Sequence, residues 1–281
     1  MPFFPPNIAA LKEKRDLAGL LMLLKGKDAR ARRAAAQALG ELGARSAVSA
    51  IAELLLSSDS SLAEKITAAE ALGVIKDDSV VDALVRELAH SRARERGAID
   101  AAIESPDRKS SLNFYVNRIA AGEYALRSAI AIALGRIGGA RGIRALFEML
   151  GTETGQMETS VKSGVKTSIG AALHNQGERF VPLLCEELKH KSVEVRQYAA
   201  YCLGEYPSEE SVNALIAAAY DEQEDFGVRD AALRSLGNIG DRRAIPYLED
   251  LVHSGNRAIV RGAQAALAEI RQKSPMRSDE S

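Results

Sequence analysis

Histidine and cysteine are the residue types in this sequence that could act as metal ligands or nucleophiles, and their spacing favours neither role. Three of the four histidines close predicted helices in separate parts of the chain, too far apart to share one metal ion. Cys185 and Cys202 fall on predicted packing faces, where a free thiol usually behaves as a small apolar side chain. No glycine-rich phosphate-binding loop and no Gly-x-Ser-x-Gly sequence occur. We therefore expect no catalytic residue, no metal site and no cofactor. The four histidines are His90, His174, His190 and His253.

A basic residue recurs in seven of the eight units of a repeated sequence and is the strongest periodic signal of chemistry. A column of cations along an array would suit phosphate binding. A base placed one turn into every second helix is explained more simply as a structural ladder, in which the stem packs and the charged head pairs with nearby carboxylates. We favour the ladder. Its predicted members are Arg32, Lys65, Arg96, Arg127, Lys166, Arg196 and Arg229.

The repeated sequence also predicts the elements that carry these residues. At intervals of 30 to 39 residues a base is followed by a run of small residues that commonly ends in Leu-Gly, as in Arg32–Gly40 (RRAAAQALG) and Arg229–Gly237 (RDAALRSLG). Self-similarity at this period is typical of a solenoid of stacked helix pairs. We expect an all-α chain forming an α-solenoid of about eight helix-pair repeats, as a single array over residues 8–272 with a disordered tail over residues 273–281. The longest connection, residues 151–164 (GTETGQMETSVKSG), predicts a mobile surface loop.

Two stretches resemble the HEAT repeat, and in particular the short, alanine-rich form known as the phycobilisome-lyase HEAT-like repeat. They are residues 31–43 (ARRAAAQALGELG) and residues 228–252 (VRDAALRSLGNIGDRRAIPYLEDLV), and the resemblance extends over nearly the whole chain. It implies a superhelix whose second helices line a concave groove. For function it implies less, because the family includes bilin lyase subunits, chaperones and repeat proteins that bind other proteins.

Two positions in each second helix are expected to face that groove. On a helical wheel of about 100° per residue, Val195, Ala199 and Leu203 share one side, and the residues one and five positions after the base lie opposite. In the predicted middle of the array these positions are uncharged and mostly small, which would allow a partner's backbone to approach closely. An alanine-rich composition without functional meaning explains the same pattern. Tyr201 is the expected interface anchor, because tyrosine buries much area at a small entropic cost. The predicted partner-binding residues are Gly97, Ala101, Ser128, Ile132, Thr167, Ala171, Gln197, Tyr201, Asp230 and Arg234.

Charge and composition narrow the class of partner. The sequence has 37 basic and 38 acidic residues, so it lacks the positive excess expected of a protein that binds nucleic acid or a membrane surface. No apolar run is long enough to cross a bilayer, and two cysteines without a secretory segment indicate a reducing, cytoplasmic compartment. We interpret the chain as a non-catalytic scaffold or assembly factor that binds another protein in the groove.

Two further functional interpretations follow from the resemblance. The alternative is a bilin-lyase-like or cofactor-handling chaperone subunit that presents a partner protein to an enzyme. A DNA-alkylation-repair-like solenoid is disfavoured, because the sequence has no tryptophan and the predicted centre of the groove is uncharged.

Overall fold

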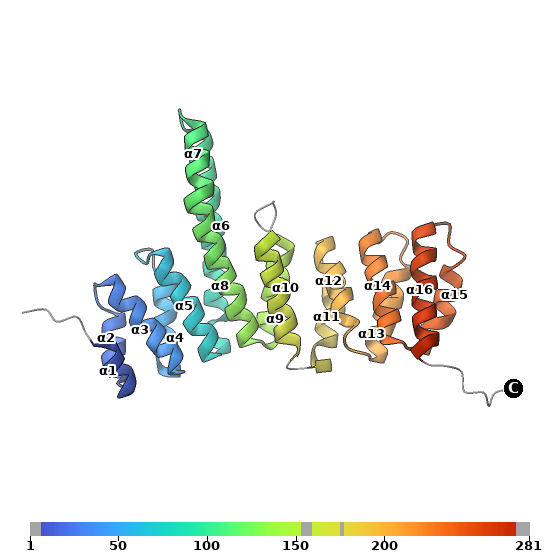
Figure 1. The fold of residues 1–281 in the computed structure, drawn as a ribbon, viewed down its shortest axis with the longest axis horizontal. Coiled ribbons are helices and arrows are strands. Elements are labelled where there is room, and N and C mark those ends of the chain that lie inside the picture. The colour runs from blue at the N-terminus through green and yellow to red at the C-terminus, as the bar shows by residue number, and fades with distance from the viewer. Residues whose placement is uncertain (1–6, 153–158, 175–176, 274–281) are drawn as a thin grey trace, which may run out of the picture. The chain divides into compact units, whose positions relative to one another are not determined.

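The chain folds almost entirely into α-helices. The computed structural model describes residues 7–152, 159–174 and 177–273, and no β-strand occurs within those ranges. Helices that follow one another pair, and within each compact unit the second helices of consecutive pairs lie side by side (Figure 1). The fold class is therefore the predicted all-α solenoid of helix-pair repeats.

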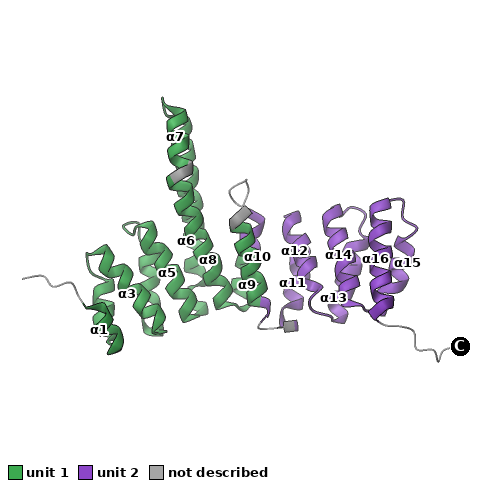
Figure 2. Ribbon diagram, viewed as in Figure 1, with its two compact units in different colours: residues 1–146, 153–172 green, residues 147–152, 173–281 purple. Residues whose placement is uncertain are grey.

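The helices divide between two compact units (Figure 2). Unit 1 comprises residues 1–146 and 153–172, and unit 2 comprises residues 147–152 and 173–281. The single array expected over residues 8–272 stays a prediction.

Two sequence-based boundaries need correction. Within the predicted loop 151–164, Gly151 and Thr152 close one helix and residues 159–164 already belong to the next, while residues 153–158 lie outside the described residues. The predicted tail starts one residue too early, because Lys273 closes the last helix. Residues 274–281 lie outside the described residues.

Unit 1 begins with a short helix and continues with helix pairs. Side-chain N-caps begin several of these helices; Ser61, for example, forms a capping box with Glu64 at the start of α5. The last pair, α9 and α10, contributes residues to both units. The helices are α1 (Ile8–Glu13), then the pairs α2 (Leu17–Leu24) and α3 (Ala29–Glu41), α4 (Val48–Leu56) and α5 (Leu62–Ile75), α6 (Val81–Glu104) and α8 (Ala121–Ile137), and α9 (Gly139–Thr152) and α10 (Thr159–His174).

Unit 2 repeats the same plan, and the first helices α11 and α15 have only 7 residues each. Two of these begin with proline close to the N-terminus, as expected for a residue that lacks a backbone donor. The pairs are α11 (Val181–Glu187) and α12 (Val193–Leu203), α13 (Glu209–Tyr220) and α14 (Phe226–Ile239), and α15 (Ile245–Leu251) and α16 (Arg257–Lys273).

The glycine of the repeated Leu-Gly sequence lets consecutive second helices approach closely. A Cβ atom on Gly73 of α5 would lie 2.7 Å from the Cα of Ala133 in α8. A Cβ atom on Gly204, the C-cap of α12, would lie 2.7 Å from the Oγ of Ser235 in α14, whose hydroxyl donates to the carbonyl of Ala200 at 2.9 Å. Any side chain at these positions would push the helices apart. The same close approach occurs at Gly40, Gly135 and Gly237.

The third helix pair overturns the predicted third repeat. Residues 96–104 form the C-terminal part of the 24-residue helix α6, not a separate second helix. The second helix that stacks on α5 is α8, as the contact between Gly73 and Ala133 shows. The position four residues before Arg96 holds Arg92 instead of a capping residue, and no Gly or Pro precedes it in this segment, so the first helix simply continues. The described ranges therefore hold seven helix pairs, because the third and fourth predicted repeats together form the single pair α6 and α8.

The extra length forms a helical hairpin that projects from unit 1 (Figure 1). We call residues 92–124 the arm. It consists of the end of α6, α7 (Arg108–Phe114), the π-helical turn η3 (Tyr115–Ala120) and the start of α8. The arm has a small core of its own, in which Ala102, Tyr115 and Ala120 are buried.

Candidate protein-binding surfaces

The repeated base closes the end of the first helix in its own pair. The Nη1 of Arg32 donates to the carbonyls of Gly26 and Lys27, just beyond α2, at 3.0 and 2.9 Å. The Nε of Arg229 donates to the carbonyl of Ala219 in the last turn of α13 at 2.9 Å. Carbonyls at a helix C-terminus have no partner within the helix and attract positive charge. The base therefore joins the two helices of a pair.

Several of these bases also reach a carboxylate of the following pair. Arg32 pairs with Glu64 of α5 at 2.8 Å, and Lys65 pairs with the fully buried Glu87 of α6 at 3.1 Å. Burial alone would raise the pKa of Glu64, but hydrogen bonds from Ser61 and Arg32 outweigh it and hold that pKa below the ordinary 4.5. The bases thus connect neighbouring pairs.

Arg196 shows both roles in unit 2. Its Nε and Nη2 each donate to Glu224 at 2.8 Å, and its Nη1 donates to the carbonyl of His190 at 2.8 Å. A bidentate pair of this kind fixes the orientation of the guanidinium as well as its position.

Arg127, Lys166 and Arg96 show that the predicted ladder is not uniform. Arg127 is fully buried, donates to Glu95 at 2.6 Å and lies over the ring of Tyr124, 4.6 Å from its centroid. Lys166 is half-buried. Arg96 is exposed on the arm and makes no hydrogen bond or ion pair among the described residues. Placing Arg96 in the ladder was therefore wrong, because α6 has no neighbouring pair at that point.

The base of the arm is fixed by buried charges that sequence reasoning missed. Arg94 donates to Glu87 at 3.0 Å and to Glu123 at 2.7 Å, so it joins α6 to the start of α8. Both carboxylates are almost completely buried. Glu95 accepts from the hydroxyl of Tyr115 at 2.9 Å as well as from Arg127. The segment RARER at residues 92–96 was the available signal, since alternating charges in a helix that is otherwise partly apolar often form such networks.

The predicted groove positions lie on the solvent side of the second helices. Ile132 is 44% exposed and Tyr201 is 55% exposed, while Ser128 and Asp230 are half-buried. In unit 1, α8 and α10 lie side by side, because a Cβ atom on Gly135 would lie 2.8 Å from the carbonyl oxygen of Ser168. In unit 2, α12 and α14 lie side by side in the same way. The remaining exposed positions on these helices are Thr167, Ala171, Gln197 and Arg234.

Gly97 and Ala101 do not belong to this set. Both are exposed, but they lie on the arm in α6, which is the first helix of its pair. They were predicted to lie on a second helix. This was wrong, because α6 continues through residues 96–104 and no new helix begins there. The uncharged, small-residue stretch on second helices is thus confined to α8 and α10 and does not extend over three repeats.

The exposed side of each second helix is longer than the two predicted positions. We call the positions three before and one, five and nine after the base the second-helix face; steps of four residues keep them on one side of a helix. The added positions hold the exposed Val193 and Phe226 at the first helical turn, and the exposed Val74 near the end of α5. The same wheel, continued one turn in each direction, would have found them.

Tyr201 is held in position by other aromatic rings. Its ring stacks on that of Tyr198 in the same helix, with centroids 5.9 Å apart and planes inclined by 15°. Tyr198 in turn lies 6.3 Å from Phe147. Burial raises the pKa of Tyr198 well above its ordinary value, so its hydroxyl stays protonated. Tyr201 therefore presents a largely preorganised aromatic surface.

The candidate chemical residues are not brought together. Cys185 and Cys202 are free thiols, and burial raises the pKa of Cys185 to about 11 and that of Cys202 to about 12. Within the described part of the chain, no group of three or more His, Cys, Asp or Glu residues is arranged to hold a metal ion. None of the helices in the same ranges combines the length and the apolar character needed to span a membrane.

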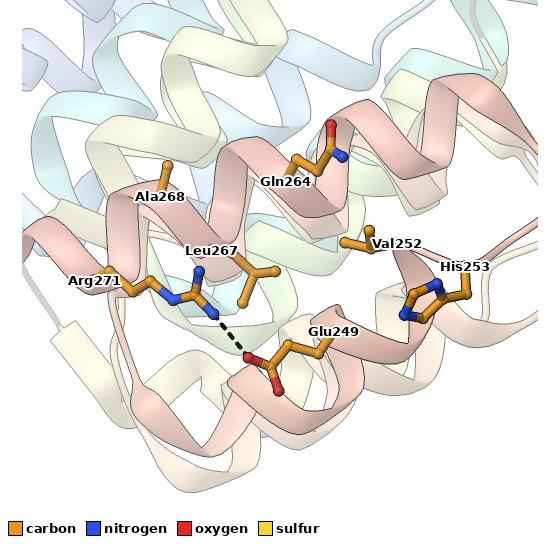
Figure 3. Close-up of a pocket in the computed structure, with 7 residues that line it drawn as sticks. All are labelled: Glu249, Val252, His253, Gln264, Leu267, Ala268 and Arg271. Atoms are coloured by element: carbon orange, nitrogen blue, oxygen red, sulfur yellow. Dashed lines mark hydrogen bonds and ion pairs between the residues drawn. The ribbon is translucent and has the colours of Figure 1, made fainter.

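The outer side of the last pair has an open depression of about 550 Å³ between α15 and α16 (Figure 3). Val252 and Leu267 form its apolar wall, and Arg271 donates to Glu249 across it at 2.8 Å. Aligned on the repeated leucine, Gln264, Ala268 and Arg271 stand where α14 has Leu233, Gly237 and Gly240.

Leu233 and Gly237 of α14, and Gly240 at its C-cap, all pack against α16. Their replacements in α16 are larger or more polar. The lining of this depression is therefore more polar than the side of α14 that stacks on α16.

Comparison with known protein families agrees with this architecture. The family model for HEAT repeats matches residues 17–105 and 181–268, which is more than half of the chain. The chain belongs to the HEAT-repeat family. The predicted resemblance is confirmed at this level.

The curated relatives narrow the type of HEAT repeat. The chain is 32% identical over 105 residues to a phycocyanobilin lyase subunit alpha of Nostoc sp., covering 34% of this chain and 38% of the relative. It is 45% identical over 60 residues to the bilin biosynthesis protein PecE of Mastigocladus laminosus, covering 21% and 22%. These matches confirm the resemblance to the phycobilisome-lyase HEAT-like repeat, and they span well under half of the relatives' lengths.

One solved structure matches nearly the whole of this chain. The complex of CpcE and CpcF of phycocyanin lyase from Nostoc sp. matches with a TM-score of 0.39 and 19% identity, covering 94% of this chain and 90% of that chain.

Proposed function

We propose that this protein is a non-catalytic binding subunit or assembly factor that holds a partner protein on the second-helix faces of its two units. The observation that carries the proposal is the exposure of large hydrophobic side chains on those faces. Eleven such side chains are exposed in the described residues, and five of them occupy second-helix positions. The five are Val74, Ile132, Val193, Tyr201 and Phe226.

The surroundings of these side chains support a protein as the partner. In unit 1, Ile132 lies beside small or uncharged residues of α10, which permit close approach of another backbone. In unit 2, Tyr201 and Phe226 are aromatic, and aromatic anchors contribute strongly to many protein interfaces. Asp230 and Arg234 pair with each other at 2.8 Å and leave no net charge there. A face of this kind favours a protein surface over a polyanion.

Affinity purification from the native host, read by mass spectrometry, tests the proposal when wild type is compared with single variants. We expect Ile132→Arg or Tyr201→Arg to lose a protein that wild type retains. Met22→Arg is the control, because Met22 is also an exposed hydrophobic residue but lies on the first helix α2. A partner retained by all of these variants would show that another surface binds it.

The relatives favour a second, narrower function, in which the chain assists a bilin lyase. Phycocyanobilin lyase subunits are among the proteins it is similar to, and the complex of CpcE and CpcF shows that such a subunit joins another protein. The test is to mix the purified chain with a second lyase subunit, a phycobiliprotein apoprotein and phycocyanobilin, and to follow covalent bilin attachment by absorbance. A rate that is unchanged when the chain is left out would reject this function and leave the general binding role.

A further inference from the structure

A second recessed surface lies in unit 2 between first helices, away from the second-helix faces. The depression between α11 and α13 has a volume of about 770 Å³. Its floor is a row of small residues on α13, Ala214, Ala217 and Ala218. The wall on the side of α11 contains Cys185 and Leu188. This floor is apolar and has no bulky side chain, so another helix could lie close to α13.

The rim of the depression is strongly acidic. It carries four carboxylates and one cation, Lys189. Two of the carboxylates already have partners outside the depression: Glu209 pairs with an arginine at 3.1 Å and Glu224 with another at 2.8 Å. Among the described residues Glu210 has no ion pair, and Asp221 has none either, although one of its oxygens accepts from the backbone N–H of Gln223 at 2.9 Å. Two carboxylates therefore remain available to a cationic ligand.

The spacing of these two carboxylates selects the shape of that ligand. Glu210 lies in the first turn of α13 and Asp221 directly follows its last residue, eleven residues later. At 1.5 Å per residue this separation is about 16 Å. A ligand helix would span this distance in about eleven residues. Two cations placed about eleven residues apart would then lie on the same side of that helix. An extended strand would cover it in about five residues and place its two cations on opposite sides.

We propose that this depression binds a basic amphipathic helix, whose small or apolar side packs on the alanine floor while cations about eleven residues apart pair with Glu210 and Asp221. The surface is separate from the second-helix faces, so the inference goes beyond the proposed function. Glu210 of α13 affects the Cys185 thiol of α11 across the depression. Burial raises the pKa of that thiol, and the negative charge of Glu210 raises it further.

Two synthetic helical peptides of about eighteen residues test the proposal. Both carry the same alanine and leucine side, and they differ only in having two lysines or two glutamates eleven residues apart. Fluorescence anisotropy at low salt should show the lysine peptide binding the full-length protein at least about tenfold more tightly than the glutamate peptide. Equal binding of the two peptides, or no binding of the lysine peptide, would overturn the proposal.

Variants of the rim separate this site from general attraction to an acidic protein. Replacing Glu210→Gln together with Asp221→Asn should weaken the lysine peptide about tenfold. The matched control, Glu53→Gln with Asp59→Asn, removes the same charge from exposed positions of unit 1 and should leave binding unchanged. Equal weakening in both double variants would overturn the proposal, and so would no weakening in either.

The two cysteines provide an independent readout in wild-type protein. Cys185 is half-buried in the wall of the depression, and Cys202 is 4% exposed and serves as the internal reference. Alkylation is slow because both thiols are largely protonated, but saturating lysine peptide should slow the reaction of Cys185 several-fold. An unchanged alkylation rate at Cys185 would place the peptide elsewhere and overturn the proposal.

Discussion

Arg127 and Arg96 occupy the same position of the repeated sequence, yet the chain uses them differently. Arg127 is fully buried against Glu95 and the ring of Tyr124, whereas Arg96 is exposed on the arm. A buried carboxylate that loses its partner keeps its desolvation cost, while an exposed cation contributes little. The position in the repeat therefore does not set the energetic role of the base; the element next to it does.

This difference gives a direct test by mutation. Arg127→Ala should lower the free energy of unfolding by about 3 kcal/mol, because Glu95, whose side chain is only 14% exposed, loses its cation. Arg96→Ala should change it by less than about 0.5 kcal/mol. Urea denaturation followed by circular dichroism measures both, and equal effects of the two substitutions would refute the assignment.

Glu64 predicts how stability responds to acid. Its pKa is below the ordinary 4.5, because hydrogen bonds from Ser61 and Arg32 outweigh the effect of burial. A carboxyl group whose pKa is lowered by folding stabilises the protein above its unfolded pKa, and that contribution is lost as the pH falls through the folded pKa. Wild type should therefore lose stability below about pH 4.5, and Glu64→Gln should lose less over the same range.

Urea denaturation at neutral pH and near pH 3 provides the comparison. Glu64→Gln should already be about 1 kcal/mol less stable than wild type at neutral pH. If both proteins lost the same stability on acidification, Glu64 would not contribute to the pH dependence.

At the scale of helices, consecutive second helices touch at the repeated glycine. A Cβ atom on Gly73 would meet the backbone of Ala133 at 2.7 Å, whereas a Cβ atom on Gly97 would have no heavy atom within 4 Å. Both glycines lie inside helices, so they have the same intrinsic cost in the helix relative to alanine.

These two glycines form a matched pair for mutation. Gly73→Ala should destabilise the protein by about 1–3 kcal/mol, since α5 and α8 must separate. Gly97→Ala should stabilise it by up to about 1 kcal/mol through helix propensity alone. Thermal denaturation distinguishes the two, and a stabilising Gly73→Ala would show that the close approach is unimportant.

The same contact explains which elements could be predicted from the sequence. Copies that end in Leu-Gly, such as those closed by Gly73 and Gly204, are all second helices that stack on a neighbour. The copy at residues 96–104 ends in Ile-Glu and keeps neither residue. Its small residues and its base follow the helical period, but they lie on the exposed arm. The arm depends on buried contacts between segments about 30 residues apart, such as Arg94 with Glu123, and a single-sequence periodicity does not reveal such pairings.

The candidate site was predictable to a similar extent. The wheel gave the exposed side of the second helices correctly, because that side follows from helix geometry alone. It did not reveal the acidic depression between α11 and α13, because the lining residues come from two helices and from the connecting segments that follow them. Such a site depends on how the pairs stack.

For the whole molecule, the balance of charge predicts the class of partner. With 37 basic and 38 acidic residues, the chain has no net excess of cations to release counterions from a nucleic acid. We expect no mobility shift of duplex or single-stranded DNA at low salt and micromolar protein. A shift that disappears with increasing salt would indicate a local cationic surface and favour the phosphate-binding interpretation of the repeated base.

The central claim is that the second-helix faces bind a partner protein, and the most direct test is to titrate the recovered partner against three proteins by isothermal calorimetry. Relative to wild type, Tyr201→Ala should weaken binding by about 1 kcal/mol or more, and Ala171→Arg should abolish it by placing a long side chain on an exposed, small-residue position of α10. Neither substitution should lower the melting temperature appreciably, since both residues are exposed. Binding of both variants with the affinity of wild type would contradict the account.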